Sequence, residues 1–284
     1  MIHFTQAEID HLIDEDLPLH DETSRALGLA GKRGTMSIYS RESAAVASCT
    51  EEAARIARAL DLEVTHMARS GQWLAPGENA LSLRGDAYHL HCAWRLCLNL
   101  LEYASGVATY TRRMVEAARE AMPGIQVATT RKAVPGTRKL MFKSVLAGGG
   151  LIHRMGLSET VLVFAQHRQF LDDPADMRAL IDRLRGECPE KRLMVEVTGR
   201  EEAIEAALAG ADVLQVDKMR PRPLAELVTA VREVRPRIVI SAAGGVTLES
   251  AADYARSGVD LLVTSRPYHA APADMGVRME SRKS

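Results

Sequence analysis

The stretch LMVEVTGREEAIEAALAGADVLQVD, residues 193–217, contains the pattern that decides the fold. A run of apolar and β-branched residues is followed by a turn, a helical segment and a second apolar run. Strands that are buried on both faces have this composition, and they occur in parallel sheets covered by helices. The stretch therefore predicts one strand–helix–strand unit of a parallel sheet.

The same alternation runs from about residue 125 to residue 265. Further apolar runs are IQVAT (125–129), TVLVFAQ (160–166), RIVISAA (237–243) and DLLVTS (260–265), and helical stretches separate the later ones. The sequence has no GxGxxG after the first run and no GxxxxGK[ST], which favours a barrel over an open nucleotide-binding sheet. We predict an α/β protein whose main domain is a parallel α/β barrel.

The residues before this region have a different character. They combine a polar start, a predicted helix over Arg41–Leu60, the extended segments LEVTHMA (62–68) and ALSLRGD (80–86), and a long amphipathic helix. This mixture predicts a small α+β unit over residues 1–107, followed by the barrel over residues 108–265. We expect the C-terminal segment, residues 266–284, to pack back on the first unit.

Length and charge narrow the classes of function. The 284 residues are 46% hydrophobic, which is enough for a sizeable core, and 36 basic residues nearly balance 37 acidic ones. Such a chain has no net positive field to attract nucleic acid or an anionic membrane. It also lacks an apolar stretch of roughly 18–20 residues and a basic leader before an apolar segment. We expect a cytoplasmic protein that binds small molecules.

Polar residues follow the predicted strands, and in a parallel barrel the carboxyl ends of the strands meet on one face. Any one of these residues could be a turn or cap residue, but together they predict a functional site. They are Thr130, Arg131 and Lys132; Gln166, His167 and Arg168; Glu196; Asp217 and Lys218; Ala243, Gly244 and Gly245; and Ser265.

Two acids stand out among these residues. Glu196 lies between valines in MVEVT, and a carboxylate there needs a cation or a metal to offset the loss of hydration. Asp217 ends the next strand, so we place the two acids at equivalent positions on successive strands and side by side at the rim. Such a pair suits Mg²⁺ or the hydroxyl groups of a sugar.

The segment 131–154 is locally basic in a chain of formal charge −1. It could be a solvated loop, but its first two cations directly follow a strand, and a glycine run at 148–150 allows close backbone approach. Arginine and lysine are the residues that bind carboxylates and phosphates, so we infer a polyanionic ligand. The cationic or titratable residues are Arg131, Lys132, Arg138, Lys139, Lys143, His153 and Arg154.

Several blocks of the sequence resemble one enzyme family. They are LNLLEYASGVATYTRR (98–113), TTRKAVPGTR (129–138), AGGGLIHRMGL (147–157), VEVTGREEAIEAALAGADVLQVD (195–217) and AAGGVTLESAADYARSGVD (242–260). In this order they resemble the quinolinate phosphoribosyltransferases, also called nicotinate-nucleotide pyrophosphorylases. The similarity extends over nearly the entire chain and looks closest to the branch encoded beside molybdate transporters, called ModD.

The resemblance implies an N-terminal α/β sandwich joined to an incomplete α/β barrel, and a homodimer whose sites borrow a basic residue from the partner. The family reaction belongs to NAD biosynthesis. It transfers ribose 5-phosphate from phosphoribosyl pyrophosphate to the ring nitrogen of quinolinate with Mg²⁺, and it releases pyrophosphate and carbon dioxide.

By motif, the resemblance implies a role for each of a set of residues. Arg95 corresponds to the arginine that the partner supplies, and Lys132 to a lysine between the substrate and the phosphates. Arg131, His153 and Arg154 correspond to the cations around the quinolinate carboxylates, Glu196 and Asp217 to the acids near the ribose and its metal, and His269 to a histidine of the phosphate-proximal loop. We add Arg138, Gly244, Gly245 and Ser265 to the expected substrate-binding residues.

Several positions depart from the family pattern, among them Trp94 in place of a glutamate and Met141-Phe142 in place of a charged pair, and three others concern the substrate most directly. Phe164 stands where the family has a lysine, Ala243 replaces a serine, and Ser265 replaces a glycine of the phosphate loop. The acceptor is therefore expected to be quinolinate or a related small anionic heterocycle. Two alternatives remain: a non-catalytic protein that binds an oxyanion or a nucleotide in a process linked to molybdenum, and a barrel lyase with a Schiff-base lysine at Lys218 or Lys132.

Overall fold

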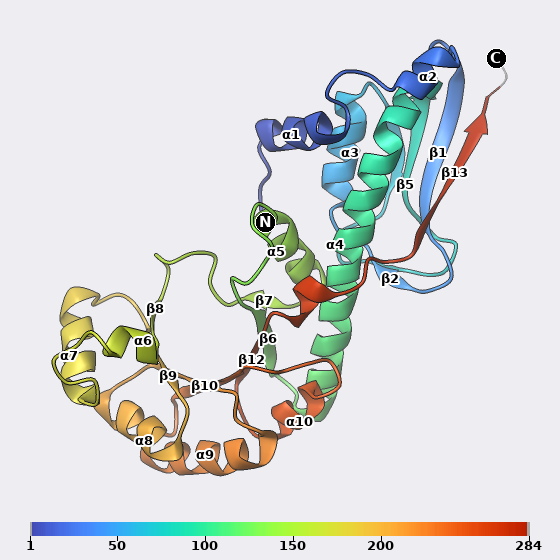
Figure 1. Cartoon of the computed structure of the whole chain (residues 1–284). Coiled ribbons are helices and arrows are strands. Elements are labelled where there is room, and N and C mark those ends of the chain that lie inside the picture. Colours follow the sequence, from blue (N-terminus) through green and yellow to red (C-terminus); the bar gives the residue numbers. More distant parts are fainter. Residues whose placement is uncertain (1, 283–284) are drawn as a thin grey trace. The chain divides into compact units, whose positions relative to one another are not determined.

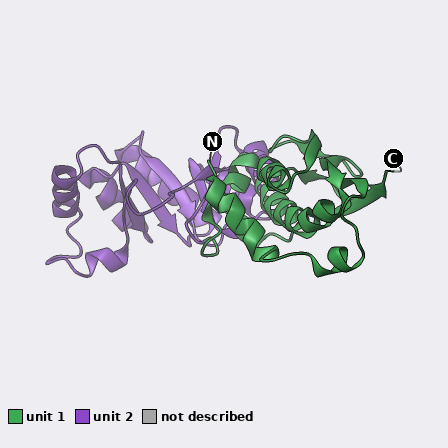
Figure 2. Ribbon diagram, turned by 90° about the horizontal axis from the view of Figure 1, so that it is seen from above, with its two compact units in different colours: residues 1–112, 133–149, 267–284 green, residues 113–132, 150–266 purple. Residues whose placement is uncertain are grey.

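The computed structural model describes residues 2–282, which form two compact units. Within these residues, unit 1 contains everything up to Arg112, then Ala133–Gly149, and the chain from Pro267 onward (Figure 2). Unit 2 contains Arg113–Lys132 and Gly150–Arg266. Each unit is therefore built from more than one stretch of the chain.

The centre of unit 1 is an antiparallel sheet of four strands in the order β13, β1, β5, β3. These strands are β1 (Arg33–Ser40), β3 (Glu63–Met67), β5 (Asn79–Asp86) and β13 (Met275–Ser281). Buried residues alternate along β1 and include Met36 and Ile38, as expected for a strand with one face on the core. Strand β13 pairs with β1 along its whole length, so a C-terminal segment completes this sheet.

The helices of unit 1 are α1 (Gln6–Asp16), α2 (Glu22–Ala26), α3 (Thr50–Ala59), α5 (Arg138–Ala147) and the first part of α4 (Ala87–Ala121). The predicted helix over Arg41–Leu60 is wrong in its first part, because α3 begins only at Thr50. Ahead of it, β2 (Ala45–Val46) pairs with β4 (Trp73–Leu74). Cys49 then adopts a left-handed φ of 59°, which interrupts helical geometry directly before α3.

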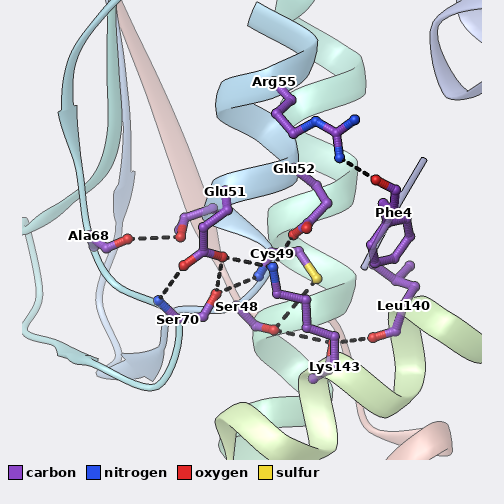
Figure 3. A network of polar contacts seen from close by, with 12 residues as sticks. Phe4, Ser48, Cys49, Glu51, Glu52, Arg55, Ala68, Ser70, Leu140 and Lys143 are labelled. Carbon is purple, nitrogen blue, oxygen red and sulfur yellow. Dashed lines mark hydrogen bonds and ion pairs between the residues drawn. The ribbon is translucent and has the colours of Figure 1, made fainter. Parts of the chain in front are cut away.

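A buried ionic network connects α5 to α3 in unit 1 (Figure 3). Lys143 forms ion pairs with Glu52 and, at 2.9 Å between Nζ and Oε2, with Glu51. The Ser70 hydroxyl also donates to Glu51, at 2.6 Å. At the end of α5, a Cβ on Gly148 would lie only 2.5 Å from a carbonyl oxygen of α4. Residues 133–149, which the sequence analysis grouped with the barrel, are thus part of unit 1.

Unit 2 contains a sheet of seven parallel strands in the order β7, β6, β12, β11, β10, β9, β8. The strands are β6 (Gln126–Thr129), β7 (Leu151–Ile152), β8 (Val161–Val163), β9 (Leu193–Val197), β10 (Val213–Asp217), β11 (Val239–Ala243) and β12 (Leu261–Thr264). Strands β7 and β8 are the two edges of this sheet, so the barrel is incomplete.

The helices of unit 2 are α6 (Ala165–Arg168), α7 (Met177–Glu187), α8 (Arg200–Ala209), α9 (Pro221–Val234) and α10 (Ala251–Arg256). Helices α7 to α10 follow the outer side of the curved sheet (Figure 1). In α9, Leu224, Leu227 and Val231 recur at helical spacing and are buried. The predicted fold class, an incomplete parallel α/β barrel with a second α/β unit, is confirmed.

In the described part of the chain, no helix combines the length and the apolar character that crossing a bilayer requires.

Candidate active site

The carboxyl ends of the parallel strands in unit 2 carry most of the predicted site residues. Because these strands run in one direction, the residues that follow them share one edge of the sheet. Arg131 and Lys132 follow β6, His153 and Arg154 follow β7, Phe164 follows β8, Glu196 lies in β9, Asp217 ends β10, Gly244 and Gly245 follow β11, and Ser265 follows β12.

Glu196 is half-buried and hydrogen-bonded to the neighbouring strand. Its register partner on β10 is Gln215, whose Nε2 donates to Glu196 Oε2 at 2.9 Å. Burial raises the pKa of Glu196 above its ordinary value, although this hydrogen bond lowers it, and the nearby Asp217 raises it further. Lys218 and Lys132 oppose the rise in pKa, so both cations lie within electrostatic reach of the Glu196 carboxylate.

The register corrects the predicted placement of the two acids. Glu196 and Asp217 are not equivalent on their strands, because Glu196 pairs with Gln215 and Asp217 lies two residues further toward the carboxyl end of β10. With a side-chain period of two, residues 215 and 217 still share a face. Gln215 was not among the predicted site residues, although a polar residue in the apolar run DVLQVD is a visible signal.

Asp217 and Lys218 at the end of β10 lie against Gly244, which follows β11, and both side chains are near Glu196. Lys218 Nζ lies 3.7 Å from Asp217 Oδ2, and the Lys218 N–H donates to the Ala243 carbonyl oxygen at 2.8 Å. A Cβ on Gly244 would lie 2.6 Å from both Asp217 Oδ1 and Lys218 Cγ. Glycine is therefore required here to let the two side chains pass, and its φ of 81° is one that glycine adopts freely.

The basic residues that follow β6 and β7 are not all charged in the free protein. Arg154 is buried, and its pKa is lowered by burial and by the nearby Arg131. Burial, with Arg154 alongside, also lowers the pKa of His153 to about 4, so His153 is neutral at pH 7. Its buried Nε2 has no hydrogen-bond partner among the described residues. In the free protein, the positive charge after these two strands therefore comes from Arg131 and Arg154, and His153 contributes a neutral imidazole.

An arginine and an aromatic ring connect the two edges of the open sheet. The Arg154 guanidinium carbon, after β7, lies 5.8 Å from the ring centroid of Phe164, after β8. The Phe164 ring is in turn 5.5 Å from the His167 ring, and the Phe164 N–H donates to His167 Nδ1 at 2.9 Å. Phe164 thus presents a flat apolar surface where Arg154 presents its charge.

The turn after β12 is held by a buried threonine. Thr264 Oγ1 donates to the Val246 carbonyl oxygen at 2.8 Å and accepts from the Arg266 N–H at 3.1 Å. These bonds place Ser265, which is half-buried, beside the turn that follows β11. A Cβ on Gly245 would meet no atom within 4 Å, so the backbone of that turn is open to a ligand.

Three predicted substrate-binding residues belong to unit 1. They are Arg95 on α4, Arg138 at the start of α5, and His269 at the end of the 3₁₀ helix η1 (Arg266–His269), and all three are exposed. Lys139 and Lys143, which the sequence analysis grouped with the basic segment, instead form ion pairs with acids of unit 1.

The acid pair fits a magnesium ion that takes its remaining ligands from water or from a phosphate group. Mg²⁺ binds through one or two carboxylates and completes its coordination with water and phosphate oxygens. Glu196 and Asp217 supply those two carboxylates. Among residues 2–282, no three His, Cys, Asp or Glu side chains are grouped in a way that could hold a metal ion. The donor set therefore suits a metal–phosphate complex better than a preformed metal cage.

Comparison with known proteins identifies relatives over the whole length of the chain. It is 37% identical over 284 residues to the provisionally named pyrophosphorylase ModD of Escherichia coli O127:H6, covering 100% of both chains. It is 32% identical over 257 residues to a probable nicotinate-nucleotide pyrophosphorylase (carboxylating) of Methanothermobacter thermautotrophicus, covering 89% of this chain and 91% of that one.

A solved structure shares the fold. The crystal structure of NadC from Streptococcus pyogenes matches with a TM-score of 0.89 and 23% identity, covering 100% of both chains. The family models for the N-terminal and C-terminal domains of quinolinate phosphoribosyl transferase match residues 21–105 and 107–278. The chain belongs to the quinolinate phosphoribosyl transferase family.

Proposed function

We propose that the protein is a cytoplasmic phosphoribosyltransferase of the nicotinate-nucleotide pyrophosphorylase (carboxylating) type. It transfers ribose 5-phosphate from phosphoribosyl pyrophosphate to quinolinate or a related small anionic heterocycle and releases pyrophosphate. The observation that carries this proposal is the gathering of Glu196, Asp217 and Lys132 at one edge of the parallel sheet, in a chain of this family.

The charges of the site suit two anionic substrates. Arg131 and Arg154 lie close enough to repel each other, and a carboxylate between them would relieve that repulsion. Lys132 lies near the acids, where it can bind a phosphate of the donor. We propose that the anionic heterocycle binds at Arg131 and Arg154. The phosphoribosyl pyrophosphate then binds near Lys132, at the same edge of the sheet.

The reaction needs no nucleophilic side chain. The bond from the ribose C1 to the diphosphate oxygen breaks, the pyrophosphate leaves with the electron pair, and the ring nitrogen of the acceptor forms the new bond to C1. We assign to Glu196 and Asp217 the stabilisation of the positive charge that develops on the ribose. With quinolinate, the carboxyl group beside the ring nitrogen would then leave as carbon dioxide, and a proton would replace it.

Bound Mg²⁺, held by Glu196 and Asp217, would neutralise the charge of the diphosphate. The side chain of Gln215 orients Glu196 through its 2.9 Å hydrogen bond. Gly245 leaves its turn open for a phosphate, and Gly244, with a φ of 81°, allows the turn to form.

We further propose a homodimer in which each site is completed by the partner. Arg95 is an exposed cation whose guanidinium carbon lies 5.3 Å from the centroid of the Trp94 ring system, and it is the residue that we assign across the dimer. We keep Arg138 and His269 as proposed substrate-binding residues on the family resemblance alone.

A second candidate function is favoured by the contact between Arg154 and Phe164. A buried cation stacked on a ring can bind an oxyanion or a nucleotide base without any chemistry. In that case the protein is a non-catalytic binding protein linked to molybdenum transport. Calorimetry would then detect binding of molybdate or a nucleotide without turnover.

The proposal is tested by measuring pyrophosphate release. The purified protein is incubated with phosphoribosyl pyrophosphate, Mg²⁺ and each of a panel of heterocyclic acids that includes quinolinate and nicotinate. We expect release that depends on one of the acids. If no acid in a broad panel promotes release, the protein is not a phosphoribosyltransferase of this type.

A further inference from the structure

We propose that Lys218 controls metal binding at Glu196 and Asp217, because its ammonium group offsets part of the negative charge of the acid pair in the free protein and must move aside when a divalent ion enters. This inference rests on the assignment of the two acids as metal ligands under the proposed function. It goes beyond that function by giving the site a resident counter-ion.

The backbone directs Lys218 toward the acids. Lys218 has a left-handed φ of 56°, which is unfavourable for a residue with a Cβ. The N–H bond to the Ala243 carbonyl oxygen and the absence of a side chain on Gly244 hold it in this conformation. Conformational strain of this kind is found where the surrounding structure has to direct a side chain.

The contact is weak enough to be exchanged. The distance between Lys218 Nζ and Asp217 Oδ2 is 3.7 Å, longer than a hydrogen bond, and the Lys218 side chain is 81% exposed. An exposed pair of this kind contributes little to stability, so the ammonium group can swing into solvent at low cost. The Asp217 side chain is only 24% exposed. The acid is therefore largely enclosed by the protein, while its counter-ion faces solvent.

The charges near the acids determine the consequence. Glu196 and Asp217 contribute two negative charges, and Lys218 and Lys132 contribute two positive charges within electrostatic reach of Glu196. A divalent ion therefore approaches a group that is close to neutral. Without Lys218, the same group would attract the ion more strongly. For a unit charge several ångströms away in a partly solvated site, we expect an affinity change of about three- to tenfold.

The test measures Mn²⁺ binding to the full chain by electron paramagnetic resonance, without any substrate. Lys218→Gln should tighten binding about three- to tenfold. The charge-conserving Lys218→Arg should leave the dissociation constant near that of the unchanged protein. Lys32→Gln, which removes an exposed lysine of unit 1, is the matched control and should have no effect. Unchanged or weaker binding by Lys218→Gln would overturn the proposal, as would the absence of Mn²⁺ binding in both proteins.

Tighter Mn²⁺ binding by Lys218→Gln without any transferase activity would support the counter-ion role and count against the proposed function. Transferase activity without tighter Mn²⁺ binding by Lys218→Gln would count against the counter-ion role of Lys218 and would leave the proposed function intact.

Discussion

Lys143→Met should destabilise unit 1 by about 3–5 kcal/mol at pH 7. The Lys143 side chain is 13% exposed, and its partner Glu52 is 6% exposed. Removing the lysine leaves Glu52 as a buried carboxylate without its counter-ion. Glu51 also loses the hydrogen bond from Lys143 and keeps the one from the Ser70 hydroxyl. Methionine fills a similar volume, so the loss should reflect charge more than packing.

The pH dependence provides a second part of this prediction. Burial alone would raise the pKa of Glu51, but hydrogen bonds from Ser70 and Lys143 hold it at about 2, below the ordinary 4.5. A shift of that size corresponds to about 3.4 kcal/mol. Because the Glu51 side chain is 39% exposed, screening reduces this to about 1–2 kcal/mol. A lowered pKa stabilises the fold above about pH 4.5, and that stability is lost as the pH falls toward 2.

The assay is urea unfolding followed by tryptophan fluorescence, because both tryptophans, Trp73 and Trp94, lie in unit 1. The control is Lys139→Met on the same helix. Lys139 and its partner Glu8 are 48% and 37% exposed, so this change should cost less than about 1 kcal/mol. A loss below about 1 kcal/mol for Lys143→Met at pH 7, or a difference that does not shrink between pH 5 and pH 2, would refute the reasoning.

Three further predictions concern the proposed reaction. Glu196→Ala should suppress turnover with little change in melting temperature, because the carboxylate is half-buried and held by one neutral hydrogen bond; loss of solubility would mean that its role is structural. Arg95→Ala and Arg131→Ala, each inactive alone, should regain activity when they are mixed and form heterodimers, and verified heterodimers without activity would contradict shared sites. Phe164→Lys should tighten binding of quinolinate about tenfold in calorimetry, the lower end expected for one charge-assisted hydrogen bond. Unchanged affinity would mean that the ring of Phe164 does not face the acceptor.

The barrel could be predicted from sequence because its strands are buried on both faces. Runs such as RLMVEVT and DVLQVD have the composition of central strands, and β9 and β10 lie within them. The same logic placed Glu196 and Asp217 on neighbouring strands. The carboxyl ends of parallel strands meet at one edge in any such sheet. The candidate residues could therefore be assigned to one site from the sequence alone.

The division of the basic segment, the charge of His153 and the strand register could not be predicted, because they depend on contacts between residues far apart in the sequence. The basic segment 131–154 looks continuous in the sequence, but its middle part belongs to unit 1, because Lys143 pairs with acids about ninety residues away. The neutrality of His153 depends on burial beside Arg154, which the residue type alone does not reveal. The pairing of Glu196 with Gln215 depends on strand register, which a parallel sheet sets through its neighbours.

The measurement that tests the central claim most directly is mass spectrometry of the product. Phosphoribosyl pyrophosphate and the heterocyclic acids are incubated with the protein and with Asp217→Asn. We expect a new ion with the mass of a ribonucleotide of one acid, with or without the loss of carbon dioxide, from the unchanged protein, and at least a tenfold lower yield from the variant. A yield that is equal in both proteins, or the absence of any nucleotide product, would contradict the assignment of this sheet edge as a phosphoribosyl-transfer site.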